Sequence, residues 1–228
     1  MNFLFLVLIF CLFVFLYVVH SLSRDDFVIL RSNASVEKIF NAAFLSAFFS
    51  LFIARLLFVV FNLKPVFHNP LGFLLFPYFP GLSLIGGLVG GFLMSLFILK
   101  VWSMPIGRIL DFFSMGFLVS FPFGLLGSFL LSGEKISSSF IFSLVFYVLL
   151  LFAFVKFILS LSLGGKLKDG SLSLLFMFSF SLIHLISNLI VNISFSYENI
   201  FSALTLLISL ILFIQKENLV QKFLIRKQ

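Results

Sequence analysis

Residues 82–99 read LSLIGGLVGGFLMSLFIL, an apolar stretch without a charged side chain. At a rise of 1.5 Å per residue, a helix of roughly 20 apolar residues crosses the hydrocarbon core of a bilayer. Six further stretches are long and apolar enough to do the same: 3–20, 40–62, 109–131, 138–163, 170–192 and 199–215. We therefore predict an all-α polytopic membrane protein with seven transmembrane helices.

The composition of the whole chain supports this fold class. Of its 228 residues, 62% are hydrophobic and 10% are charged, whereas an ordinary soluble domain has roughly 25% charged residues. A water-soluble globule is therefore excluded. A single cysteine, Cys11, excludes an intramolecular disulfide and a cysteine-clustered metal site, and we expect neither a metal nor a cofactor. The basic residues flank apolar segments and form no aromatic-interleaved patch, so we expect no nucleic-acid partner.

The basic residues indicate the orientation in the membrane. Connections on one side carry eleven of them: Arg24, Arg31, Lys38, Lys100, Arg108, Lys166, Lys168, Lys216, Lys222, Arg226 and Lys227. The opposite connections carry two, Lys64 and Lys135. Because basic loops stay in the cytoplasm, the amino terminus is predicted outside and the carboxyl terminus in the cytoplasm.

Residues 1–228 are expected to form one transmembrane domain, since no internal repeat is evident and the connections are uneven. The long cytoplasmic loop is 21–39. The long outer segment is 63–81, where four prolines among aromatic residues prevent a regular helix and favour an interfacial position.

Two basic residues lie inside predicted spans. Lys156 is close enough to the cytoplasmic end of its helix to extend its amine there, which indicates a structural role. Arg55 lies about 10 Å from the outer end of its helix, and a guanidinium suits a phosphate or a carboxylate. An intramembrane arginine is therefore a candidate binding residue, although an arginine that bonds a carbonyl and only fixes helix depth is the alternative.

Small residues repeat at every fourth position on two neighbouring spans. Span 82–99 has Ser83, Gly87, Gly91 and Ser95. Span 109–131 has Gly116, Ser120, Gly124 and Ser128, and Ser132 follows directly after it. Such stripes let helix backbones approach closely in lipid, so we expect these two spans to pack against each other. The alternative is that the glycines let a ligand approach the backbone.

Polar residues gather in the outer half of the sixth span. His184, Asn188 and Asn192 are four residues apart and share one helix face. They act either as hydrogen-bonding contacts between helices or as part of an outward-facing polar cavity. The cavity would include other polar residues on the same side: Arg55, Ser83, Ser128, Ser132, Glu198, Asn199 and Ser202. His20 and His68 are weaker candidates, because one ends a helix and the other lies in the interfacial segment.

Three motifs resemble a known family. Ala54-Arg55-Leu56 ends the second span, residues 81–88 read GLSLIGGL, and residues 124–129 read GLLGSF after Asp111. This pattern is similar to prolipoprotein diacylglyceryl transferase, a seven-helix bacterial inner-membrane enzyme whose corresponding motifs are Ala-Arg-Leu, Gly-Leu-Ser-Phe-His-Gly-Gly-Leu and Gly-Arg-Ile-Gly-Asn-Phe.

The chain departs from this family where the family carries its chemistry. Ile85 replaces the motif histidine, Leu125 replaces the motif arginine, and Ser128 replaces the motif asparagine. Glu134 lies one position beyond the family's glutamate, and the remaining matches, at His184 with Asn188 and at Asn199 with Ser202, rest on spacing.

The resemblance implies transfer of a diacylglyceryl group from phosphatidylglycerol to the lipobox cysteine of a prolipoprotein signal peptide, in the bacterial inner membrane. The phospholipid would contact residues of several spans: Arg55, Ser83, Gly86, Gly87, Ser128, Asn188 and Asn199. His184 would be the catalytic base in place of the missing histidine. Loss of a base or of a charge-stabilising donor each removes about 10²–10⁴ in rate.

Two other functions stay open. Ile85 and Leu125 favour a non-catalytic relative that binds phospholipid or a lipoprotein signal segment without transferring anything. An unrelated carrier is disfavoured, because no pair of repeated or broken helices is evident.

Overall fold

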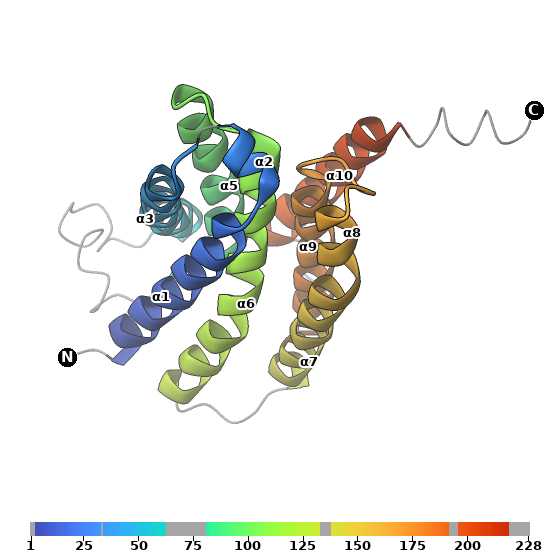
Figure 1. Cartoon of the computed structure of the whole chain (residues 1–228). Coiled ribbons are helices and arrows are strands. Elements are labelled where there is room, and N and C mark those ends of the chain that lie inside the picture. Colours follow the sequence, from blue (N-terminus) through green and yellow to red (C-terminus); the bar gives the residue numbers. More distant parts are fainter. Residues whose placement is uncertain (1–2, 33, 63–80, 133–137, 192–195, 219–228) are drawn as a thin grey trace, which may run out of the picture.

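A computed structural model describes residues 3–32, 34–62, 81–132, 138–191 and 196–218. Within these ranges every regular element is a helix, and seven helical spans are long and apolar enough to cross a membrane (Figure 1). The spans are α1 (Phe3–Arg24), α3 (Val36–Phe61), α5 (Leu84–Val101), α6 (Ile106–Ser132), the continuous run of α7 (Ser138–Ala153), π-helical η2 (Phe154–Ile158) and α8 (Leu159–Leu163), then α9 (Ser171–Val191) and α10 (Tyr197–Glu217). The prediction of an all-α multi-pass membrane protein is confirmed.

Several helices begin at a capping residue and not where the apolar stretch of sequence begins. The side chains of Ser35, Ser83 and Ser196 accept hydrogen bonds from the first turns of α3, α5 and α10. As a result α3 begins four residues earlier than predicted. The predicted loop 21–39 also contains a short helix, α2 (Phe27–Arg31). The predicted outer segment lies outside the described residues, except for Gly81.

The helices form two packed groups joined by α6. Figure 1 shows α1, α3 and α5 on one side of α6 and α7 to α10 on the other. One buried cluster lies among α1, α3, α5 and α6 around Ile39, Leu99 and Phe112, and a second lies among α5, α6, α7 and α9 around Leu118 and Phe180.

The two glycine stripes pack helices closely, but against other partners than predicted. We expected α5 and α6 to pack on each other; instead the glycines of α5 face α3, and those of α6 face α1. On α5, Gly86, Gly87, Gly90 and Gly91 meet Leu57, Ala54, Ile53 and Ser50; on α6, Gly116, Gly124 and Gly127 meet Phe15, Cys11 and Val7. The correction has a geometric reason: each stripe occupies one helix face, and spacing alone does not say which neighbour meets that face.

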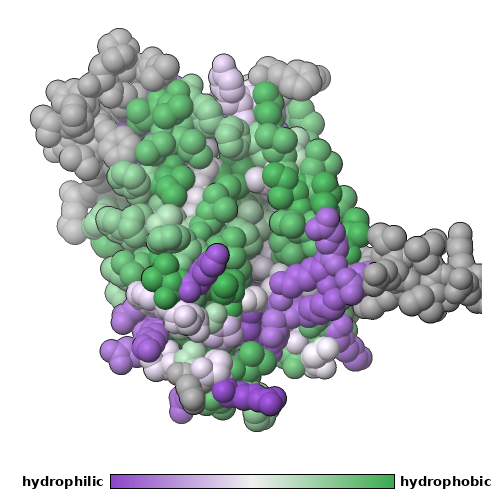
Figure 2. All heavy atoms as spheres, turned by 90° about the horizontal axis from the view of Figure 1, so that it is seen from above, coloured by the Kyte–Doolittle hydropathy of each residue, from purple (hydrophilic) through white to green (hydrophobic). Residues whose placement is uncertain are grey.

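The outer surface and the helix ends differ in polarity. Many large apolar side chains on the helix faces are exposed, including Phe13, Phe97, Leu130 and Ile208, as expected of surfaces in contact with lipid. A group of exposed charged side chains lies at the end where α1, α2, α3, α5 and the α8–α9 loop meet: Arg24, Asp25, Arg31, Glu37, Lys38, Lys100, Lys166, Lys168 and Asp169. Figure 2 shows hydrophilic residues gathered over one part of the molecule and hydrophobic ones over the rest. We call this end the charged end; its cytoplasmic location stays a prediction.

We predict that Gly90→Ala lowers the free energy of unfolding by about 1–3 kcal/mol, the usual cost of overpacking. A Cβ atom at Gly90 would lie 2.7 Å from Cβ of Ile53 and closer still to its Cγ2, so α3 and α5 must separate. Denaturant titration in detergent measures the change. Gly124→Ala is the matched control, because its Cβ would lie 3.6 Å from the Cys11 sulfur, an ordinary contact. Equal stability of the two variants would contradict this account of the α3–α5 contact.

Candidate functional site

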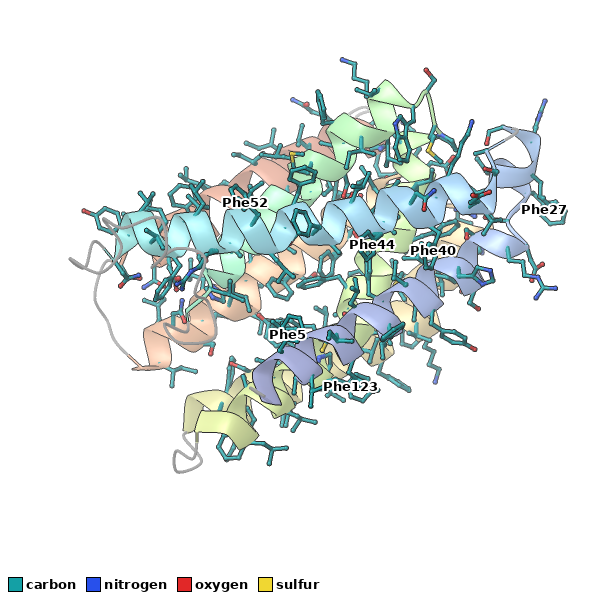
Figure 3. The ribbon with its side chains drawn as sticks, turned by 90° about the vertical axis from the view of Figure 1, so that its left-hand side faces the viewer. Phe5, Phe27, Phe40, Phe44, Phe52 and Phe123 are labelled. Atoms are coloured by element: carbon teal, nitrogen blue, oxygen red, sulfur yellow. The ribbon has the colours of Figure 1, made fainter. Side chains whose placement is uncertain are left out.

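A lateral cavity of about 480 Å³ lies among α1, α3, α5 and α6. Figure 3 shows α1 and α3 converging near Phe40 and separating toward Phe5 and Phe52. The cavity lining is mainly apolar, with serine hydroxyls from α3, α5 and α6. Three of the predicted phospholipid-binding residues line it: Ser83, Gly87 and Ser128. The cavity is therefore less polar than the outward-facing cavity expected from the sequence.

The backbone geometry of α3 and α5 shapes this cavity. The Ser50 hydroxyl donates to the Gly87 carbonyl at 2.7 Å, across the helix pair. The Ser83 backbone N–H donates to the Ala54 carbonyl at 3.0 Å, and the Ser83 hydroxyl accepts from the Gly86 N–H at 3.2 Å. Gly86 and Gly87 thus serve helix packing, and Gly87 also forms part of the cavity wall. The packing alternative therefore applies at both glycines, and approach of a ligand to Gly87 stays a prediction.

Arg55 is buried beside the cavity. Its Nη1 atom donates to the Gly81 carbonyl at 2.9 Å, and its guanidinium carbon lies 5.8 Å from the centre of the Phe58 ring. Among the described residues, the cavity lining includes the adjacent Ala54 and Gly81 but not Arg55 itself. The guanidinium therefore bonds a carbonyl, as one alternative expected, and that carbonyl belongs to Gly81, a residue of the cavity lining.

The polar stripe of α9 faces α10. His184 Nδ1 lies 2.9 Å from the Ser202 hydroxyl. Asn188 Nδ2 donates to Asn199 Oδ1 at 3.1 Å and lies 3.5 Å from His184 Nδ1. These four residues form one hydrogen-bonded chain between two helices. Asn192, the third residue of the stripe, lies outside the described residues.

The polar chain on α10 adjoins the cavity through Glu198. The Glu198 carboxyl lies close to the Ser83 hydroxyl, and Ser83 lines the cavity. The Phe61 ring stacks on Tyr197 with centroids 5.4 Å apart, so the end of α3 also contacts the start of α10. The structure thus divides the predicted site residues into two neighbouring groups, one at the α3–α5 contact and one between α9 and α10. Ser128 lies apart on the α6 wall, where it donates to the Leu125 carbonyl at 2.8 Å.

The positions that depart from the resembled family take different environments. Ile85 is fully buried in the core. Its apolar side chain cannot accept a proton as the family's histidine would. Leu125 is half-buried and lines the cavity with an apolar side chain. Glu134 and His68 lie outside the described residues. His20 is exposed on α1.

The charged end contains a buried network that the sequence analysis missed. Arg108 Nε and Nη2 donate to Asp26 Oδ2 at 2.9 and 2.7 Å, and Arg108 Nη1 donates to the Ser162 carbonyl at 3.1 Å. Asp111 accepts from the N–H groups of Gly170 and Ser173, both at 2.8 Å, and so caps α9 from a neighbouring helix.

Glu217 completes this network by accepting from the backbone N–H of Lys168 at 2.9 Å and from the Ser171 hydroxyl at 2.5 Å. The loop between α8 and α9 is therefore held by acidic and basic groups from other parts of the chain. One signal pointed there: Asp111 is the only acidic residue inside the predicted spans, and such residues are costly in lipid. Arg108 and Asp26 carried no signal of pairing, because they are 82 residues apart.

We predict that Arg108→Ala lowers the free energy of unfolding by about 3–5 kcal/mol, because Asp26 stays buried without its partner. The double variant Asp26→Ala/Arg108→Ala should lose less than the sum of the two single losses, since it removes both charges. Denaturant titration of the four proteins gives the coupling energy. Lys166→Ala, an exposed residue at the same end, is the control and should change stability by no more than about 0.5 kcal/mol. Additive losses would mean that the ion pair contributes no coupling.

Comparisons with known proteins do not indicate a function. No protein-family model, no curated protein and no solved structure matches the chain. The lateral cavity, the buried Arg55 and the polar chain between α9 and α10 are therefore the observations on which a function is argued.

Proposed function

We propose that this membrane protein binds a phospholipid, with an acyl chain in the lateral cavity and the headgroup near Arg55. The observation that carries the proposal is the cavity among α1, α3, α5 and α6, which is lined by apolar side chains from all four helices. Its lining on α6 extends from Leu110 to Ser128, which corresponds to about 27 Å along a helix. An elongated, mainly apolar space among helices with lipid-exposed faces suits an acyl chain.

The headgroup position is inferred from charge. Arg55 lies next to Ala54 and bonds Gly81, both of which line the cavity. A guanidinium pairs well with phosphate, and Ser83 supplies a hydroxyl on the same side. The proposed ligand is an anionic phospholipid such as phosphatidylglycerol, and the proposed location is the bacterial inner membrane.

Binding without catalysis is the first proposal because of two replaced positions. The fully buried Ile85 and the apolar Leu125 stand where the resembled family has a histidine and an arginine. His184 is engaged with Ser202 and Asn188 between two helices, and it does not line the cavity formed by the described residues.

A diacylglyceryl transferase is the second candidate, and one observation favours it. The Glu198 carboxyl lies close to Ser83, a residue of the cavity wall, so a proton acceptor lies near the cavity. His184 joins the same helix through Ser202, whose hydroxyl donates to the Glu198 carbonyl at 2.8 Å. In this candidate the thiol of a prolipoprotein signal peptide attacks the glycerol carbon, Glu198 or His184 takes the thiol proton, and the phosphate ester leaves beside Arg55.

We predict that phosphatidylglycerol protects Cys11 from a membrane-soluble maleimide. Cys11 is the only cysteine of the chain and lines the cavity, so an acyl chain in the cavity covers its sulfur. Mass spectrometry of the detergent-purified protein, titrated with the lipid, gives the apparent affinity. Arg55→Gln should weaken that affinity about tenfold or more, the cost of losing a charge-assisted contact.

Lys156→Gln is the matched control for that titration. Lys156 is the other intramembrane cation, but its amine lies over the Phe152 and Phe157 rings on the outer surface. Protection of Cys11 should not change in this variant. Failure of any phospholipid to protect Cys11 would overturn the binding proposal.

For the transferase, we predict that Glu198→Gln lowers the rate of diacylglyceryl transfer by about 10²–10⁴, the usual effect of losing a general base. The assay follows labelled phosphatidylglycerol to a lipobox peptide with purified protein, and His184→Ala is measured beside it. A larger loss with His184→Ala would assign the base to that residue. If no transfer exceeds background while Cys11 stays protected, only the binding proposal survives.

A further inference from the structure

The short helix α2 presents apolar side chains outward at the charged end. Its Ile29 is fully buried, but Phe27 is 86% exposed and Leu30 is 60% exposed. Figure 3 shows Phe27 pointing away from the bundle. Covering Phe27 and Leu30 with an apolar surface would gain the free energy of burying two large apolar side chains.

The orientation of α2 is fixed by the buried network. Asp26 caps the helix, with Oδ1 accepting from the N–H groups of Val28 at 3.0 Å and Ile29 at 3.2 Å. The other carboxylate oxygen of Asp26 is held by Arg108 of α6 at 2.7 Å. Since Asp26 and Ile29 are both anchored in the interior, Phe27 and Leu30 are held on the outer side.

The charges around α2 favour an anionic surface. Four exposed cations lie at this corner of the molecule, at the ends of α1, α2 and α5 and at the start of α3: Arg24, Arg31, Lys38 and Lys100. Two exposed acids, Asp25 and Glu37, oppose them, which leaves an excess of two positive charges. Trp102, at the end of α5, is also partly exposed there, and tryptophan is enriched at membrane interfaces.

We propose that α2 is an interfacial anchor that docks on the anionic phospholipid leaflet next to the charged end. Phe27 and Leu30 enter the boundary between headgroups and acyl chains, roughly 5–10 Å deep as for other interfacial helices. Arg24 and Arg31 contact lipid phosphates. This lipid contact lies at the end of the molecule opposite Arg55, and it does not depend on the function proposed for the cavity.

The experiment uses Phe27→Trp in a Trp102→Phe background, which leaves one tryptophan in the full chain. The protein is reconstituted in phosphatidylcholine nanodiscs that contain acyl-brominated phosphatidylcholine or acyl-brominated phosphatidylglycerol. We expect blue-shifted emission from the introduced tryptophan and stronger quenching by bromines near the headgroup than by bromines near the chain end. We also expect phosphatidylglycerol to quench at a lower mole fraction than phosphatidylcholine.

Charge variants separate the anionic preference from simple burial. Arg24→Gln and Arg31→Gln should each reduce the preference for phosphatidylglycerol about fivefold, as expected for one cation near an anionic surface. Lys166→Gln, an exposed cation on the α8–α9 loop, is the matched control and should leave it unchanged. Leu30→Trp in the same background repeats the depth measurement if the Phe27→Trp substitution perturbs the helix.

Three outcomes would overturn the proposal. Water-like emission that no brominated lipid quenches would show that α2 does not contact the leaflet. Equal quenching by the two lipids, unaffected by the charge variants, would remove the anionic preference. Emission that shifts only when two protein copies share a nanodisc would show that a second copy covers α2. None of these outcomes affects protection of Cys11, so the cavity proposal is tested separately.

Discussion

Close contact between α3 and α5 is the constraint on which the rest of the structure depends. Lipid supplies no hydrophobic drive for helices to associate, so α3 and α5 approach through residues without bulk. Ser50 donates to the Gly87 carbonyl across this contact, and Ser83 donates its N–H to Ala54. These bonds place Arg55 beside Gly81 and set one wall of the lateral cavity. A bulkier residue at Gly87 would move the wall and the guanidinium together.

The two ends of the bundle use polar groups differently. At the end with Arg55, the polar side chains join α9 to α10 through single hydrogen bonds, and Glu198 lies close to the cavity wall. At the charged end, Arg108, Asp111 and Glu217 hold the α8–α9 loop and the α2 corner through buried charges. Buried charges of this kind are costly unless fully paired, and here pairing fixes the loops that connect the spans. The proposed headgroup site at Arg55 and the buried charged network therefore lie at opposite ends of the bundle.

Much of the site could be predicted as a set of residues but not as an arrangement. The four-residue spacing of His184 and Asn188 places them on one face, and that face indeed joins another helix. The same reasoning placed Arg55 and Ser83 near each other. It also predicted one polar cavity, whereas the structure has an apolar cavity beside a separate hydrogen-bonded chain. Glu198 shows why: it lies close to Ser83 because α10 and α5 are neighbours, and no local pattern encodes which spans are neighbours.

The sequence by itself determined that the chain has seven segments able to cross a membrane, because apolar length and helical rise are local properties of each segment. It also determined which positions are small enough for helices to meet. Only the tertiary structure decided the partners of those positions, α3 for the α5 glycines and α1 for the α6 glycines. The ion pair between Asp26 and Arg108 belongs to the same class. The two residues are 82 positions apart. They meet because all the helices pack together around one interior, and no single segment specifies that arrangement.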